Sequence, residues 1–231
     1  MINNKFFAID SHCHIYPEKI ASLAIGHTDK FYDTISFNNG LVGDLIEKGN
    51  KAGIDKFLIQ SVATTPKQVR KINQFIANEV LNNSDRLIGL GTMHPESEDI
   101  LGDIHHLLDL GLKGIKIHPD IQNFDIDDAR YVKIMEYCGK FNIPILMHTG
   151  DKRYDHSNPN RLLPLIKSMP NTTFIGAHFG GWSIWEDACE KYRELDNFYV
   201  DCSSSFYYIS KDTARKLILS YGDDKVLCAT D

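Results

Sequence analysis

Short runs of apolar residues recur along the chain at a nearly constant interval. Each run has the length and the β-branched or aromatic content of a buried strand. From the second run onward, successive starts lie 25 to 31 residues apart. The eight predicted strands are Phe6–His12, Lys56–Ala63, Leu87–Met93, Gly114–His118, Ile143–His148, Thr173–His178, Phe198–Cys202 and Lys225–Ala229.

The segments between these runs have a helical pattern. Apolar residues share one face at helical spacing over 69–80, 100–108 and 132–138. Gly111 is placed to end the second of these helices. Strands that alternate with helices form a parallel sheet, because parallel neighbours need a crossover connection. A doubly wound open sheet and a closed (β/α)8 TIM barrel both satisfy this pattern.

Histidines favour the barrel. One or more of them stand at or near the ends of predicted strands one, three, four, five and six: His12, His14, His94, His118, His148 and His178. An open sheet would spread these strand ends along a line, whereas a barrel gathers them around one axis. In TIM barrels the active site lies at the carboxyl ends of the strands. We therefore predict a single barrel domain over residues 1–231, with its site at that mouth.

Two segments depart from the repeat. The first connection is about twenty residues longer than the others, and residues 15–40, Pro17–Asn39 in particular, are predicted to form an irregular loop insertion over the barrel mouth. The sequence also ends at Asp231, directly after the eighth strand, without an eighth helix. Either that side of the barrel lacks the helix or the natural chain is longer, and we favour the second interpretation.

Composition narrows the class of protein. The net charge is -6, and no long basic cluster is present, which argues against a nucleic-acid partner. Five cysteines without a C-x-x-C pair suggest neither a disulfide framework nor a zinc ribbon. No signal peptide or transmembrane run is apparent, so we expect a cytoplasmic protein without a membrane partner. A small-molecule substrate fits this composition, and a homo-oligomer is compatible with it.

The sharpest local motif is the H-x-H of His12 and His14. Residues two apart on a strand point to the same face, so both imidazoles enter the mouth together. Asp10 shares that face one step deeper and could orient one of the histidines. Imidazole is the commonest side-chain metal ligand, so a metal-centred site is expected at this mouth.

Taken together, the segments IDSHCH, GIKIHP, ILMHTG, IGAHFGG and CATD resemble the amidohydrolase superfamily, in the branch of predicted TIM-barrel hydrolases that includes aminocarboxymuconate-semialdehyde decarboxylase. The resemblance implies that the metal ligands are His12, His14, His148 and Asp231. It also implies that Asp231 carries a proton and that His178 either polarises the substrate or binds a second metal ion.

Other residues at the mouth are assigned less sharply. Lys116 and His118 share a face of the fourth strand. Lys116 is either a carbamylated bridge between two metal ions or, as we favour, a buried cation paired with a carboxylate such as Asp10. We expect the substrate-binding residues to be His118, Lys116 and Trp182, and we expect His105 and His106 to lie on the surface of a helix.

Three histidines and a carboxylate suit Zn²⁺ or another divalent ion such as Mn²⁺, and one ion is favoured over two. The leading interpretation is hydrolysis of a C–N or C–O bond in a small molecule by metal-activated water. The alternative is a non-oxidative decarboxylase, acting on a small carboxylic acid, aromatic acids included, at the same metal site. A nuclease of the TatD-like type is disfavoured because GIKIHP offers no glutamate. A non-catalytic metal-binding barrel would require a closed ligand shell.

Overall fold

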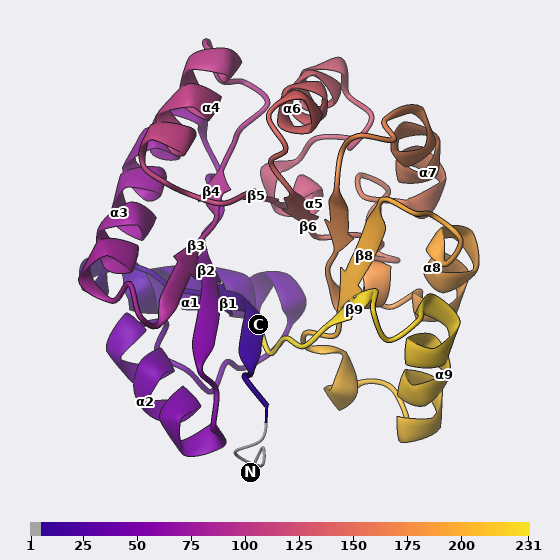
Figure 1. Cartoon of the computed structure of the whole chain (residues 1–231), viewed down its shortest axis with the longest axis horizontal. Coiled ribbons are helices and arrows are strands. Elements are labelled where there is room, and N and C mark those ends of the chain that lie inside the picture. Colours follow the sequence, from indigo (N-terminus) through magenta and orange to yellow (C-terminus); the bar gives the residue numbers. More distant parts are fainter. Residues whose placement is uncertain (1–5) are drawn as a thin grey trace.

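The computed structural model describes residues 6–231, and its strands stand in a ring surrounded by helices (Figure 1). The strands are β1 (Ile9–His14), β2 (Lys56–Gln60), β3 (Leu87–Gly89), β4 (Gly91–Thr92), β5 (Ile115–Ile117), β6 (Ile145–Met147), β7 (Phe174–Gly176), β8 (Phe198–Asp201) and β9 (Val226–Leu227). The helices are α1 (Glu18–Tyr32), α2 (Val42–Ala52), α3 (Val69–Asn82), α4 (Ile100–Asp109), α5 (Pro119–Gln122), α6 (Ala129–Lys140), α7 (Pro159–Ser168), α8 (Trp185–Tyr192) and α9 (Lys211–Tyr221).

All strand pairs in this part of the chain are parallel, in the orders β1-β2-β3 and β4-β5-β6-β7-β8-β9. Only Leu90 separates β3 from β4, and its N–H donates to the carbonyl of Ile59 at 2.9 Å. β3 and β4 are therefore one strand position that pairs with β2 at one end and with β5 at the other. The described residues thus contain eight strand positions, and each overlaps one of the eight predicted strands.

The ring closes between β1 and the segment that follows β9, which runs from β9 to β1 in Figure 1. The Ser11 N–H donates to the Cys228 carbonyl at 2.9 Å, and the Asp231 N–H donates to the His12 carbonyl at 2.8 Å. Closure places the carboxyl ends of all strands around one opening, as in a (β/α)8 barrel. The predicted fold class is confirmed.

Strand residues divide between two sides of the barrel wall. Ile115, Ile117, Ile145 and Met147 are fully buried in the main core, between the strands and the helices. By alternation the residues between them point inward. A smaller cluster of Leu90, Leu146 and Ala177 is separate from the main core and fills the barrel interior.

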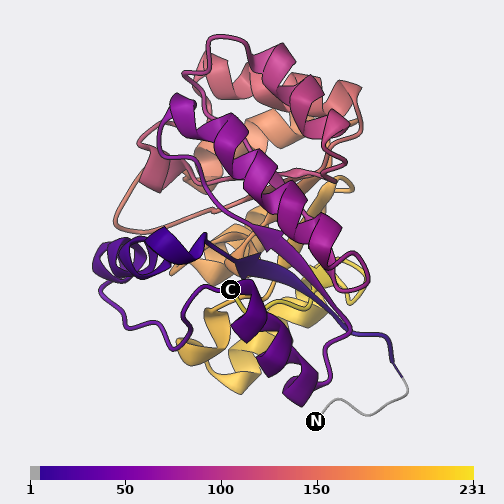
Figure 2. The same ribbon diagram turned by 90° about the vertical axis from the view of Figure 1, so that its left-hand side faces the viewer.

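The segment 15–40 differs from the prediction. It is not an irregular loop, because α1 occupies 15 of its residues. The helical pattern is weak, since Ala21 is the only residue of α1 that is buried, while Ile20 and Leu23 remain exposed. Figure 2 shows α1 at the side of the molecule opposite the N-terminus, beyond the carboxyl end of β1. The predicted irregular conformation of this segment was therefore wrong.

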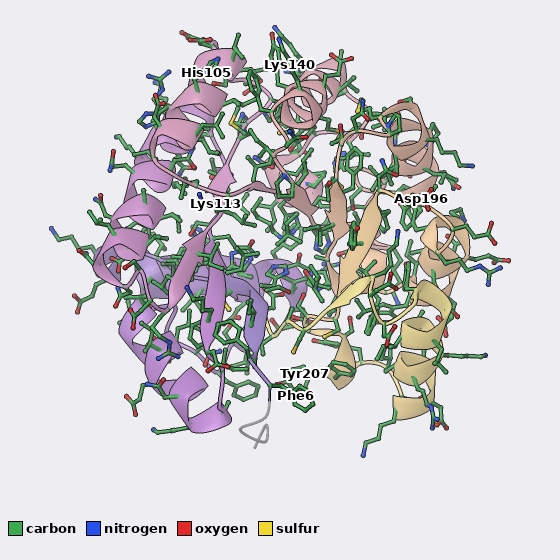
Figure 3. The ribbon with its side chains drawn as sticks, in the orientation of Figure 1. Phe6, His105, Lys113, Lys140, Asp196 and Tyr207 are labelled. Carbon is green, nitrogen blue, oxygen red and sulfur yellow. The ribbon has the colours of Figure 1, made fainter. Side chains whose placement is uncertain are left out.

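The two adjacent histidines of α4 differ in exposure, and His106 is half-buried. His105 is exposed on α4 and lies at the outer edge of the molecule (Figure 3). Across residues 6–231, the helices are too short or too polar for any of them to traverse a lipid bilayer.

Candidate metal centre and active site

Three predicted ligands converge at the barrel mouth. The Nε2 atoms of His12 and His14 are 3.2 Å apart, and Asp231 Oδ1 lies 3.4 Å from the first and 3.6 Å from the second. Within the described residues these three side chains form a group whose donor atoms all lie within 4.8 Å of one another. The alternation of β1 brings the two imidazoles to one face, and barrel closure brings Asp231 to them.

A buried carboxylate sets the tautomer of His12. Asp201, at the end of β8, accepts a hydrogen bond from His12 Nδ1 at 2.8 Å, and its side chain is 0% exposed. A carboxylate only accepts, so Nδ1 carries the proton and Nε2 keeps its lone pair facing His14 and Asp231. The sequence analysis missed Asp201. Its position at the end of a predicted strand was the available signal.

Asp10 does not hold a histidine ring, contrary to the sequence-based expectation. Its carboxylate accepts from the Thr230 hydroxyl at 2.6 Å and from the Thr230 N–H at 3.0 Å. It also accepts from the backbone N–H of His12 at 3.3 Å. Asp10 therefore ties the strand that precedes Asp231 to β1, while Asp201 takes the orienting position.

Lys116 is fully buried on β5, and its Nζ lies 3.1 Å from His12 Nε2. The expected pairing with Asp10 is wrong, because Asp10 bonds Thr230 instead. Burial lowers the pKa of Lys116 to about 8, although the nearby charges of Asp231 and Asp201 oppose that shift. An amine with this pKa is more readily deprotonated than a surface lysine.

The structure places His148 outside the three-residue group. Its ring stacks on that of His118, with centroids 4.1 Å apart and an interplanar angle of 5°. Its Nδ1 lies 3.2 Å from the Tyr32 hydroxyl. Its buried Nε2 has no hydrogen-bond partner among the described residues and lies 3.6 Å from Asp120 Oδ2. Whether His148 is a ligand stays a prediction.

His178 reaches the site through an unusual backbone. It follows Ala177, which points into the barrel, so simple alternation would turn its side chain outward. Instead His178 and Phe179 both have left-handed backbones, with φ of 58° and 55°. Strained backbone of this kind clusters at functional sites. The ring of His178 lies 5.6 Å from that of His12 and 5.1 Å from that of His148, measured between centroids.

The hydrogen bonds of His178 fix its tautomer. Its Nδ1 lies 3.0 Å from the Ser203 carbonyl, which can only accept, so Nδ1 carries the proton. Nε2 is then the unprotonated nitrogen of the neutral ring. Burial lowers the pKa of His178, which favours this neutral form. The Trp182 ring stands edge-on to His178 at 5.2 Å, so the predicted substrate-facing Trp182 does border this site.

The donor set fits a divalent cation. Burial lowers the pKa of His14 to about 3, so its ring is neutral and can offer a lone pair. Burial raises the pKa of Asp231, but neighbouring His12 and His14 outweigh this effect and hold it below its usual range. Two imidazoles and one carboxylate suit zinc, manganese or similar ions.

Comparison with known proteins gives a family match over nearly the whole chain. The family model described as "Amidohydrolase" matches residues 9–231. A curated protein, 2-amino-3-carboxymuconate-6-semialdehyde decarboxylase from Dictyostelium discoideum, is 29% identical over 106 residues, which are 45% of this chain and 30% of that protein. The chain therefore spans less than a third of the length of this curated relative.

Solved structures share the fold. An uncharacterised TIM-barrel protein from Bordetella bronchiseptica has a TM-score of 0.80 at 16% identity, covering 97% of this chain and 85% of that one. The 5-carboxyvanillate decarboxylase from Novosphingobium aromaticivorans, complexed with manganese and 4-hydroxy-3-methoxy-5-nitrobenzoic acid, has a TM-score of 0.73 at 16% identity, covering 98% and 86%. At such identities the likeness establishes the barrel fold alone.

Proposed function

Since the chain belongs to the amidohydrolase family, as its match over residues 9–231 shows, we propose that it is a metal-dependent decarboxylase of a small carboxylic acid. The curated relative and the manganese-bound structure are both decarboxylases, which supports the alternative of the sequence analysis better than hydrolysis. The observation that carries the proposal is the convergence of His12, His14 and Asp231 in a family with such relatives.

One divalent ion, Mn²⁺ or Zn²⁺, would be held by His12, His14 and Asp231. When bound, the ion would act as a Lewis acid that draws electron density from the substrate's oxygen atoms. Manganese has a precedent in the decarboxylase from Novosphingobium aromaticivorans. We retain His148 as a fourth ligand only as a prediction, because its nitrogens have other neighbours.

The chain's own groups supply the rest of the reaction. Loss of CO₂ leaves a carbon that must gain one proton. Asp231 and the Nε2 of His178 are both unprotonated in the resting site, so either can take up a proton and pass it to that carbon. Lys116 is a buried cation whose Nζ contacts His12 rather than a carboxylate of the protein. We therefore propose that Lys116 binds the carboxylate of the substrate.

Aromatic side chains at the mouth favour a flat substrate. Trp182 packs edge-on against Tyr32 with centroids 5.9 Å apart, and against Tyr208 at 4.8 Å. The stacked rings of His118 and His148 add a further planar surface. Such walls suit an unsaturated or aromatic acid, because ring faces and edges pack favourably against each other.

The test is to incubate the protein, loaded with Mn²⁺ or Zn²⁺, with hydroxylated aromatic carboxylic acids and to measure released CO₂. In D₂O each turnover should place one deuterium on the product carbon. His178→Gln should lower kcat by about 100-fold or more, the usual contribution of a positioned acid–base group. His105→Gln is the matched control, because His105 is exposed on α4. Turnover of lactones or amides without CO₂ release would instead restore the hydrolase interpretation.

A further inference from the structure

Tyr32, the last residue of α1, reaches from outside the barrel repeat into the site. Its hydroxyl lies 2.6 Å from His118 Nε2 and 3.2 Å from His148 Nδ1. No motif marks this tyrosine in the sequence, because it lies in the segment that was predicted to be an irregular loop. A single hydroxyl thus joins two histidines that come from different strands.

An arginine clamp holds the end of α1 in place. Arg153 Nη1 donates to the Phe31 carbonyl at 2.7 Å, which satisfies a carbonyl in the last turn of the helix. The guanidinium lies 5.2 Å from the centroid of the Phe31 ring and 5.3 Å from that of the Tyr32 ring. Asp151, which is 2% exposed, binds the same guanidinium through both oxygens. The clamp fixes Tyr32 relative to the loop that follows β6.

The backbone determines which nitrogen of His118 faces Tyr32 as a donor. The Ile121 N–H donates to His118 Nδ1 at 3.2 Å, so Nδ1 is unprotonated. An imidazole that accepts a hydrogen bond at Nδ1 carries its proton on Nε2. His118 Nε2 therefore donates to the Tyr32 oxygen. The Tyr32 hydroxyl makes its second hydrogen bond with His148 Nδ1.

We propose that Tyr32 is a positioning residue: clamped by Arg153, its hydroxyl bridges His118 and His148 and fixes the orientation of both rings at the barrel mouth. Without that bridge the two rings keep their mutual stacking at 4.1 Å, the Ile121 hydrogen bond to His118, and edge-on ring contacts of His118 with Phe31 and of His148 with His178. The catalytic consequence rests on the proposed decarboxylase function, whereas the placement of the rings does not.

The experiment compares wild-type protein with Tyr32→Phe, which removes the hydroxyl and keeps the ring. Nitrogen-15 NMR of the imidazoles should show His118 protonated at Nε2 in the wild type. In Tyr32→Phe the ring signals of both His118 and His148 should shift. The kcat should fall about 10- to 100-fold, as for other residues that orient active-site groups, with little change in KM. Tyr137→Phe, on the outer helix α6, is the matched control.

A second variant keeps the histidine contacts and loosens the clamp. Arg153→Gln should shift the same two ring signals in the same direction, by less than Tyr32→Phe does. The proposal is overturned if the signals of His118 and His148 are the same in Tyr32→Phe as in the wild type, or if kcat is unchanged. If the wild type releases no CO₂ from any acid, the proposed function fails, and the NMR comparison still decides the role of Tyr32.

Discussion

Replacing Asp201 by asparagine tests how the metal-binding nitrogen of His12 is set. Asp201 Oδ1 accepts from the backbone N–H groups of His178 at 3.1 Å and Ser203 at 3.0 Å. In the variant the amide oxygen should keep these two donors, which turns the NH₂ group toward His12 Nδ1. Two donors would then face each other. The His12 proton must move to Nε2, the atom that faces His14 and Asp231.

Two estimates of the effect agree. A hydrogen bond to a charged group contributes about 1.5 to 3 kcal/mol. Loss of the residue that orients a metal-binding histidine weakens metal affinity by about 10- to 100-fold, which corresponds to about 1.4 to 2.7 kcal/mol. Asp201→Asn should therefore bind Mn²⁺ or Zn²⁺ 10 to 100 times more weakly, because His12 no longer presents a lone pair.

The assay is titration of the metal-free protein with each ion in competition with a chelating dye. Asp103→Asn is the matched control, because Asp103 is also buried but pairs with Arg70 at 2.6 Å between the outer helices α3 and α4. It should lose stability and keep its metal affinity. Equal metal affinity in wild type and Asp201→Asn would refute the tautomer argument, and so would an equal loss in both variants.

Three further predictions concern stability. Burial raises the pKa of Asp120 from 3.8 to about 6, so between these values the folded protein holds a proton that the unfolded chain has released. The free energy of unfolding should fall by about 3 kcal/mol as the pH rises through that window, because each pKa unit corresponds to about 1.4 kcal/mol. Urea unfolding at low and neutral pH should show this loss in the wild type and its absence in Asp120→Asn. Ile145→Ala should lower the free energy of unfolding by about 2 to 5 kcal/mol in the same assay, because Ile145 is 0% exposed between the strands and the helices. A loss under about 1 kcal/mol would contradict this, because it would mean that neighbouring side chains fill the cavity. Asp128→Ala removes the side-chain cap on the Arg130 N–H at the start of α6 and should lower the thermal midpoint through a loss of about 1 kcal/mol, and an unchanged midpoint would contradict that role.

The local pattern of the chain was sufficient to predict the barrel and part of the metal-binding group. Residues two apart on a regular strand point to the same face, which predicts that His12 and His14 share one side of β1. The structure keeps them together, although the pairing of β1 with β2 shifts register between Asp10 and Cys13. The repeat of strands and helices restricts the connections to parallel crossovers. These properties depend on residues a few positions apart, which is why a single sequence reveals them. The helical conformation of α1 was not predicted, because α1 buries too little apolar surface for its sequence to show a helical period.

Only the tertiary structure decided which groups meet. Asp201 lies 189 residues from His12 in the chain, and Tyr32 lies 86 residues from His118. The inward turn of His178 depends on a left-handed backbone that its residue type does not demand. Hydrogen-bond partners, tautomers and the separation of His148 from the three-residue group follow from distances of a few ångströms between distant segments. The sequence determined which side chains arrive at the mouth, and closure of the barrel determined what each one contacts there.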